Sequence, residues 1–374
     1  MEVLRQRMPD FWQRRATEGA TTQQFNVFGY PLLLTTNSQR LVAACAAWVA
    51  KFSTAPLAAA EAPMQISLFE RQAADRSRGR AETAEWDAVN LEGESPFTYD
   101  GHGDWIAISA GRDGHVLADL RKQEAIGFVA PSLAAQTALV SKFIFGTVLY
   151  NLLTRRAGLL QWHAVALVHE DTVLLLIGHD NSGKSTTALT LLHAGFTLLA
   201  DGLIYTRLDA AGVEVLASPV GELRVRPGAF DFFPHLRQQA VALNTWEGEK
   251  YRLDLAQVFP GRYTSASPRV TRLLPLFVSV GQRLATHITP LTAGQALERA
   301  IPALGWWDSL PFLETVLHHA HTLLARHPAF ALEVGWERDA LVASISGLIT
   351  SARKRIRRIT FRFRPSRNPG SWCG

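Results

Sequence analysis

The sequence predicts an α/β fold, in which a domain with a mixed, partly antiparallel sheet follows a smaller α+β domain. After residue 158, apolar runs typical of buried strands alternate with segments of helical periodicity. Between residues 97 and 119, short strand-like runs follow one another across turns rich in Asp and Gly, which is typical of an antiparallel meander. We therefore place the first domain at residues 1–130, the second at 131–350, and a basic tail at 351–374.

The elements of the first domain are predicted from apolar spacing and from turn residues. Residues 25–34 predict one strand with a bend at Gly29, and residues 38–52 predict a helix with apolar residues at the 3.6-residue period. A helix over 132–154 is expected to pack the first domain against the second. Further short strands are predicted at 64–69, 97–99, 105–109 and 115–119.

The elements of the second domain follow from the same signals. Two apolar runs predict strands at 160–168 and 172–177, joined by a tight turn, and a helix at 186–193 is followed by the helix-ending Gly195. Residues 240–249 predict a loop. The other predicted strands are 197–200, 203–208, 221–225, 250–255, 273–280 and 329–334, and the other predicted helices are 292–301, 310–326 and 338–349.

One stretch of this domain carries a chemical motif. Residues 178–186 match the phosphate-binding pattern G-x-x-x-x-G-K-[ST], with a predicted strand before it and a helix after it. Backbone N–H groups of such a loop point at phosphate oxygens, and its glycines let the main chain approach them. Lys184 would bridge the outer phosphates, and Ser185 would offer its hydroxyl to Mg²⁺. The residues expected to hold the nucleotide are Gly178, Asp180, Asn181, Ser182, Gly183, Lys184, Ser185 and Thr186.

Composition and cysteine use indicate the general class of protein. Hydrophobic residues make up 47% of the chain and charged residues 19%, which is ordinary for a soluble globular protein. The two cysteines form no C-x-x-C pattern, so we expect free thiols and a cytoplasmic location. The N-terminal residues lack the apolar segment of a signal peptide, and no apolar run is long enough to predict a membrane span.

The net charge of +5 is concentrated in the tail. Residues 351–374 hold eight Arg and Lys residues and no acid, so the tail carries +8 and the rest of the chain −3. Such a tail binds nucleic acid, an acidic partner or a membrane surface, or else it is a solvated terminus. We favour the solvated terminus and expect no nucleic-acid partner, because no nucleic-acid-binding motif accompanies the tail.

A carboxylate after the loop helix narrows the chemistry. Asp201 ends the predicted strand 197–200, where it can hold Mg²⁺ or accept a proton from an attacking hydroxyl. The sequence has no N-K-x-D string of a GTPase and no LSGGQ-like string of an ABC ATPase.

Two other clusters of acidic and histidine residues do not predict a metal site. Asp100, His102 and Asp104 predict a hydrophilic turn, and the histidines of 318–321 lack a carboxylate that would complete a metal site.

These residues together resemble a known family. His163 precedes a β-hairpin and the phosphate loop, a Gly-Phe turn follows the helix, and the strand then ends in the acid Asp201. Further on, Glu222 stands in a strand before a glycine turn. This order resembles the catalytic domain of HPr kinase/phosphorylase and of related serine or peptide kinases. The match is good over residues 158–230 and extends by general pattern to 335.

The resemblance implies a fold and a reaction. The fold is the α/β nucleotide domain of the HPr kinase and phosphoenolpyruvate carboxykinase type, with ATP and Mg²⁺ as cofactors. Lys184 would contact the outer phosphates, Ser185 and Glu222 would hold Mg²⁺, Asp201 would be the base, and His163 would support that base. One departure is Gly202, which stands where the family usually has a second acid.

The predicted function is transfer of the γ-phosphoryl group of ATP to a hydroxyl, by analogy that of a serine. The acceptor is a peptide, a protein or a small molecule, and a homo-oligomer is left open. The alternative is a nucleotide-binding regulator with little turnover, which Gly202 and the unfamiliar first domain would favour. A third hypothesis is a nucleic-acid-associated ATPase that uses the basic tail.

Overall fold

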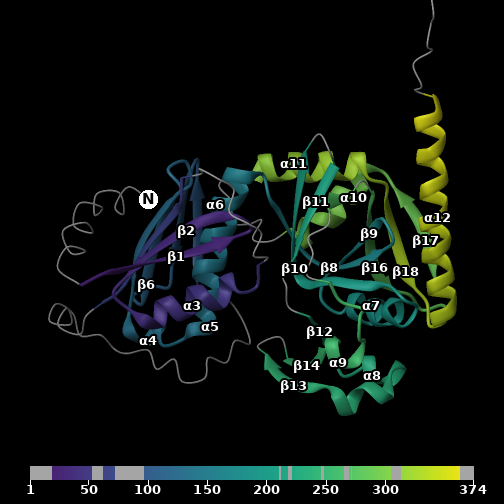
Figure 1. The fold of residues 1–374 in the computed structure, drawn as a ribbon, viewed down its shortest axis with the longest axis horizontal. Coiled ribbons are helices and arrows are strands. Elements are labelled where there is room, and N and C mark those ends of the chain that lie inside the picture. Colours follow the sequence, from purple (N-terminus) through teal and green to yellow (C-terminus); the bar gives the residue numbers. More distant parts are fainter. Residues whose placement is uncertain are drawn as a thin grey trace, which may run out of the picture.

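The computed structural model describes residues 19–52, 62–71, 97–209, 212–217, 221–245, 248–264, 269–270, 272–304 and 313–362, with side chains of the last helix described to residue 352. Two sheets dominate this part of the chain and lie side by side (Figure 1). Mixed sheets and packed helices make it an α/β protein, as the sequence predicts.

The first sheet is formed by the N-terminal strands in the order β1-β2-β3-β7-β6-β5-β4. Parallel pairing joins β3 to β2 and to β7, and the other neighbours are antiparallel. Helix α3, Gln39–Val49, packs on this sheet through Leu41, Ala44, Cys45 and Trp48. The strands are β1 Thr21–Val27, β2 Tyr30–Thr36, β3 Met64–Glu70, β4 Thr98–His102, β5 Trp105–Ser109, β6 Gly114–Asp119 and β7 Glu124–Val129.

The second sheet has the order β15-β11-β10-β8-β9-β16-β18-β17. Strand β16 is parallel to β9 and β18, whereas β8 is antiparallel to both β9 and β10. This confirms the expected mixed, partly antiparallel sheet. The strands are β8 Leu160–His169, β9 Thr172–Ile177, β10 Thr197–Asp209, β11 Gly212–Ala217, β15 Arg269–Val270, β16 Arg272–Val280, β17 His287–Leu291 and β18 Ala329–Val334.

Helices cover both faces of the second sheet. One face packs on α10, Ala293–Ala300, and α11, Leu313–Arg326. The other face packs on α7, Lys184–His193, and α12, Arg338–Arg362, beside a small sheet of order β12-β14-β13. These small strands and the neighbouring helical turns are β12 Glu222–Val225, β13 Val241–Thr245, β14 Gly248–Asp254, α8 Ala229–Phe232, η3 Pro234–Gln239, α9 Leu255–Val258 and η4 Ile301–Ala303.

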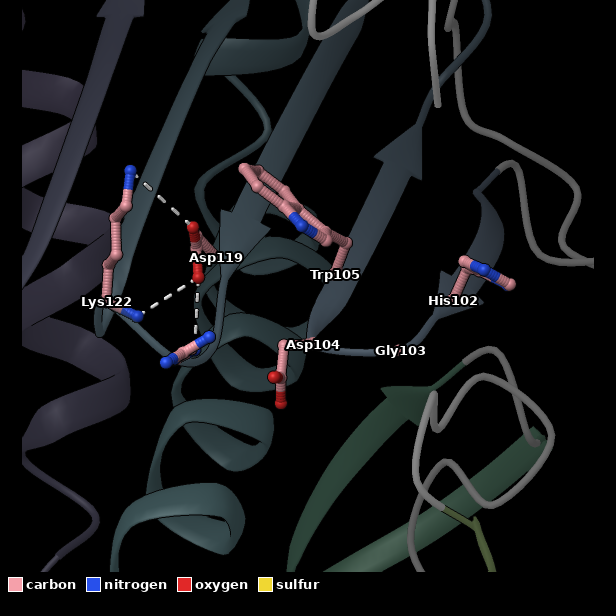
Figure 2. Close-up of a pocket in the computed structure, with 7 residues that line it drawn as sticks. His102, Gly103, Asp104, Trp105, Asp119 and Lys122 are labelled. Atoms are coloured by element: carbon pink, nitrogen blue, oxygen red, sulfur yellow. Dashed lines mark hydrogen bonds and ion pairs between the residues drawn. The ribbon is translucent and has the colours of Figure 1, made fainter.

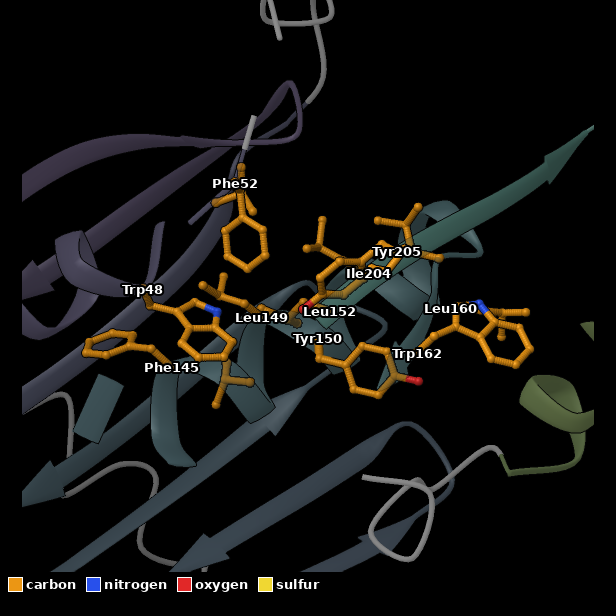
Figure 3. Packing of buried hydrophobic residues seen from close by; sticks show 14 of the residues in the cluster. Trp48, Phe52, Phe145, Leu149, Tyr150, Leu152, Leu160, Trp162, Ile204 and Tyr205 are labelled. Carbon is orange, nitrogen blue, oxygen red and sulfur yellow. The ribbon is translucent and has the colours of Figure 1, made fainter. Parts of the chain in front are cut away.

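A buried aromatic cluster joins the two sheets (Figure 3). Phe52, which follows α3, lies with its ring centroid 5.6 Å from that of Tyr205 in β10. Phe28 contacts both rings, at 4.8 and 5.2 Å. Tyr205 also donates a hydrogen bond of 2.9 Å to the Gln161 side chain. The first sheet and its helix therefore brace strand β10 directly.

The segment predicted as one helix over 132–154 is divided. It forms α4 Pro131–Ala134, α5 Thr137–Leu139, the π-helical η2 Val140–Phe145 and α6 Gly146–Ala157. Within the described residues, Thr137–Ala157 is the one helix long and apolar enough to span a membrane, and 78% of its apolar window is buried inside the protein. A helix buried to this extent belongs to the core of the folded protein.

Several predicted elements were wrong. Residues 25–34 form two strands, because Phe28 and Gly29 both adopt positive φ, at 54° and 87°, and close a tight hairpin. The predicted loop 240–249 contains β13, which pairs with β14. Helix α12 continues past residue 349 to Arg362, so part of the predicted tail is helical. Strands β7, β11, β15 and β17 were not predicted. Residues 70–95 are polar and charged, which predicts a surface loop, and 72–95 of them lie outside the described residues.

Candidate active site

The phosphate-binding motif lies between β9 and α7, as its pattern requires. Asn181 and Gly183 have positive φ, at 63° and 93°, so the chain turns sharply just before the helix. A Cβ at Gly178 would lie 2.5 Å from the Ser182 hydroxyl and 2.9 Å from the Val278 carbonyl. Only glycine fits at Gly178, because the loop folds back on itself there.

Lys184 begins helix α7 and points back into the loop. Its side chain is 8% exposed, and its Nζ donates hydrogen bonds to the carbonyls of Gly178 at 2.6 Å and His179 at 2.8 Å. Those hydrogen bonds hold the ammonium group inside the loop, where it can contact the phosphates of a bound nucleotide.

Hydroxyl groups surround the same loop. Ser182 is almost fully buried, and its Oγ makes no hydrogen bond within the described residues. Ser185 and Thr186 are half-buried in the first turn of α7, and Asp180 and Asn181 are exposed. A loop with main-chain turns, an inward lysine and hydroxyls in the first helical turn fits a triphosphate with its metal ion. Ser185 would be the hydroxyl ligand of Mg²⁺ in such a complex.

Asp201 lies close to the loop in space. It does not end a strand, because β10 runs through it from Thr197 to Asp209, opposite Val165 of β8. Its Oδ2 accepts a hydrogen bond of 2.8 Å from the backbone N–H of Arg224 in β12. The carboxylate also interacts electrostatically with Lys184. The structure therefore places Asp201 within electrostatic range of the loop lysine.

Burial raises the pKa of Asp201 above its ordinary value. The Arg224 N–H and the positive charges of Arg224, Lys184 and Lys250 act in the opposite direction without cancelling this effect. A carboxylate whose pKa is shifted towards neutrality is a better general base than an ordinary one.

The residue after Asp201 has an unusual backbone. Gly202 adopts φ of 108°, and no atom lies within 4 Å of the position a Cβ would take. Space for a side chain is available, but the backbone angle is strained for an L residue. A second acid at this position would therefore require the strand to change its conformation.

His163 stands on β8, opposite Leu203 of β10. Its Nε2 lies 3.7 Å from the Oδ1 of Asp180, and both side chains are nearly half exposed. This contact ties His163 to the phosphate loop. Its predicted role beside Asp201 stays a prediction.

Glu222, the second predicted metal ligand, is the first residue of β12. Its Oε1 lies 3.2 Å from the Nη1 of Arg252 on the neighbouring strand β14. Glu222 and Arg224 alternate with the buried Leu223 and Val225, so both stand on the open face of the strand. For Glu222 to hold Mg²⁺, it would have to exchange its arginine partner for the ion.

Two residues of the site were missed by sequence reasoning. Arg224 was not among the predicted site residues, yet its backbone N–H donates a hydrogen bond to Asp201, and Lys250 of β14 interacts electrostatically with the same carboxylate. A main-chain donor has no sequence signal of its own, because its position depends on how β12 docks against β10. The charge alternation of KYRLDL at 250–255 predicted the strand but not the direction of its lysine.

Two hollows lie elsewhere on the molecule. One, of about 620 Å³, is lined by His102, Asp104, Trp105 and Asp119 at the β4–β5 turn (Figure 2). Its acids already have partners: Asp104 pairs with Arg155 at 2.8 Å, and Asp119 accepts the backbone N–H groups of the following turn. The turn itself is Gly103–Asp104, whereas Asp100 and His102, which were predicted as part of a hydrophilic turn, belong to strand β4.

The second hollow, of about 650 Å³, lies between α7 and the start of α12 and is lined by His193, Phe233 and Arg338. The His193 ring stacks on Phe233 at 4.8 Å, and its Nδ1 lies 2.9 Å from the Leu189 carbonyl. These contacts indicate that the hollow is a gap between packed helices and not a ligand site. Within the described residues, no three His, Cys, Asp or Glu side chains gather as a metal cluster, and this includes the histidines of α11.

Comparisons with known proteins add one finding. No protein-family model matches the chain, and no curated protein matches it. Among solved structures, the HPr(Ser) kinase/phosphatase from Coxiella burnetii matches over 53% of this chain and 98% of its own, with 15% sequence identity and a TM-score of 0.27. This likeness concerns the fold alone, and at so low a TM-score it says nothing about activity. The function is therefore inferred from the residues of the site.

Proposed function

We propose that this protein is an ATP-dependent kinase that transfers the γ-phosphoryl group to a hydroxyl, in the first instance that of a serine. The observation that carries the proposal is a loop of the phosphate-binding pattern that holds Lys184 inside it, with the Asp201 carboxylate within electrostatic range of that lysine. Phosphoryl transfer needs a positioned donor, neutralised phosphate charge and one proton acceptor. The loop, Lys184 and Asp201 are suited to these three tasks.

Each residue has a defined part in this reaction. The loop amides and Lys184 bind the phosphates, and Asp201 accepts the proton of the attacking hydroxyl. The Arg224 N–H holds one oxygen of Asp201, and the other oxygen would accept the proton. Mg²⁺, held by Ser185 and by Glu222 once it leaves Arg252, would neutralise charge on the phosphates.

His163 acts on the loop in this proposal. Its contact with Asp180 would steady the tip of the loop over the phosphates, and a protonated imidazole would add positive charge there. A role as support for Asp201 would instead show as a change in the pH dependence of turnover in the His163→Asn variant.

The test is transfer of labelled phosphate from ATP into peptides, proteins and small hydroxyl compounds. The wild-type chain should label an acceptor, and the Lys184→Ala and Asp201→Asn chains should not. Equal labelling by all three chains would contradict the proposal. The matched control is Lys122→Ala, because Lys122 is an exposed lysine at a distant turn, paired with Asp119 at 4.0 Å.

The alternative is a nucleotide-binding regulator, and the backbone at Gly202 favours it. Gly202 has φ of 108°, which disfavours any L residue, including a second acid, at this position. Asp201 is therefore not followed by another acid in β10. Binding of ATP with no phosphoryl transfer to any acceptor in a broad panel would support that alternative.

A further inference from the structure

Exposed apolar side chains lie at one edge of the second sheet. Val280, the last residue of β16, is 59% exposed, Leu284 in the following turn is 66% exposed, and Trp336 just after β18 is 55% exposed. The two segments are joined, because the Trp336 N–H donates a hydrogen bond of 3.3 Å to the Arg283 carbonyl and the next N–H donates one of 3.1 Å to the Leu284 carbonyl. Apolar groups exposed together on a soluble protein mark a binding surface.

This apolar edge adjoins the phosphate loop. A Cβ at Gly183 would lie 3.1 Å from the Cγ2 of Val280, and a Cβ at Gly178 would lie 2.9 Å from the Val278 carbonyl. Strands β9 and β18 are both parallel to β16, which lies between them (Figure 1). The loop, Val280 and Trp336 therefore stand at the carboxyl ends of three neighbouring strands, where open α/β sheets bind their ligands.

Trp336 presents a supported aromatic surface at this edge. Its ring centroid lies 5.7 Å from that of Phe232 in α8, with 31° between the ring planes. The Phe232 carbonyl accepts a hydrogen bond of 3.0 Å from the Nη1 of Arg338, which ties α8 to the start of α12. The indole thus packs on Phe232 and still leaves half of the residue open to solvent, where another flat ring can stack on it.

The sheet order places Asp201 and Trp336 on opposite sides of the phosphate loop. Asp201 is in β10, two strands from β9 in one direction, and Trp336 follows β18, two strands from β9 in the other. Each lateral separation is about 10 Å, since neighbouring strands lie roughly 4.8 Å apart. Phosphoryl transfer keeps the attacking and leaving oxygens in line, so the nucleoside of the donor extends away from the proton acceptor. Trp336 is therefore on the nucleoside side of the loop.

We propose that Trp336 stacks on the base of the bound nucleotide, with Val280 and Leu284 as the apolar surface beside it. This inference deepens the proposed function and rests on it, because the phosphates of the same nucleotide lie in the loop. The ligand class is a nucleoside triphosphate. Stacking favours any base that has a flat π face, so this surface supplies affinity and not a choice between adenine and guanine.

The test is calorimetric titration of Mg·ATP and of Mg·tripolyphosphate, which has the phosphates and no base. The wild-type chain should bind ATP more tightly than tripolyphosphate. Trp336→Ala should lower the ATP affinity about 5- to 100-fold, the range expected for loss of one base–aromatic stack, and leave the tripolyphosphate affinity unchanged. Trp336→Phe should restore most of the ATP affinity. The matched control is Val241→Ser, which changes a half-exposed apolar residue of β13 and should bind both probes as the wild type does.

Unchanged tripolyphosphate binding also shows that the Trp336→Ala chain keeps its folded loop. Equal ATP affinity in Trp336→Ala and the wild type, or an equal loss for both probes, would overturn the inference. Normal ATP binding with poor transfer to a peptide would assign the surface to the acceptor and overturn it as well. If neither probe binds the wild-type chain, the inference and the kinase proposal both fail. Base-dependent binding through Trp336 without transfer to any acceptor would support the inference and contradict the kinase proposal alone.

Discussion

Replacing Asp201 by Asn separates the chemical role of this side chain from its structural role. The amide Oδ1 can still accept the 2.8 Å hydrogen bond from Arg224, so strand β12 should stay docked on β10. The proton acceptor is lost, and a general base contributes about 10²–10⁴-fold to the rate. We therefore expect turnover to fall by that factor, which is a rise of roughly 3–5 kcal/mol in the barrier.

Stability should change in the opposite direction. Because the pKa of Asp201 is raised in the fold, the ionised carboxylate is disfavoured there at neutral pH. The protonated Asp201 side chain therefore favours the folded state below the unfolded pKa of the group. This contribution to the free energy of unfolding is lost as pH rises through the folded pKa. The Asn variant carries no charge at any pH, so its Tm should gain on the wild type as pH is raised from 4 to 7.

The two assays are labelled phosphoryl transfer at saturating ATP and thermal unfolding followed by circular dichroism. ATP affinity should be equal to the wild type or tighter, because a negative charge near Lys184 is removed. An Asn variant that is less stable at pH 7 and transfers phosphate at the normal rate would refute the assignment of Asp201 as a partly desolvated base.

Three further predictions follow from individual contacts. Gly178→Ala should weaken ATP binding at least tenfold by calorimetry, because its Cβ would lie 2.5 Å from the Ser182 hydroxyl; Gly294→Ala, with open space, is the control. Gly146→Ala should destabilise the fold by about 1 kcal/mol in urea, because overpacking against Trp48 outweighs the gain in helix propensity. His327 has a pKa lowered to about 4 by burial, so acid should remove up to roughly 3 kcal/mol of stability between pH 6.5 and 4, and much less in His327→Gln.

Each of these has a contrary outcome. Normal ATP binding by Gly178→Ala would mean that the loop can open without cost. A more stable Gly146→Ala chain would mean that the contact between α3 and η2–α6 is loose. An acid midpoint that the His327→Gln change does not move would exclude this histidine as a source of acid sensitivity.

The phosphate loop could be predicted from sequence because local signals agree there. An apolar β-branched and leucine-rich run, a glycine loop and an amphipathic helix follow one another within residues 172–193, and the structure forms β9, the loop and α7 in that order. Capping also gave a local signal at Thr292, whose hydroxyl and Gln295 form the capping box that begins α10.

Other features depend on contacts distant in sequence. The hairpin at Phe28 and Gly29 was missed, because Phe at positive φ is rare and nothing nearby in the sequence requires it. Strand β13 lies in a polar segment and exists because β14 pairs with it. The position of Arg224 at Asp201 depends on strand docking across 23 residues, which no local pattern encodes.

The central claim is that the loop ahead of Lys184 binds a triphosphate, and calorimetric titration of Mg·ATP tests it most directly. We expect one saturable site in the wild-type chain, with affinity about 10- to 100-fold lower in Lys184→Ala, since hydrogen bonds to a charged group contribute roughly 1.5–3 kcal/mol. The Lys122→Ala chain should bind as the wild type does. Titration heats equal to dilution in the wild type, or equal affinity in Lys184→Ala, would contradict the account.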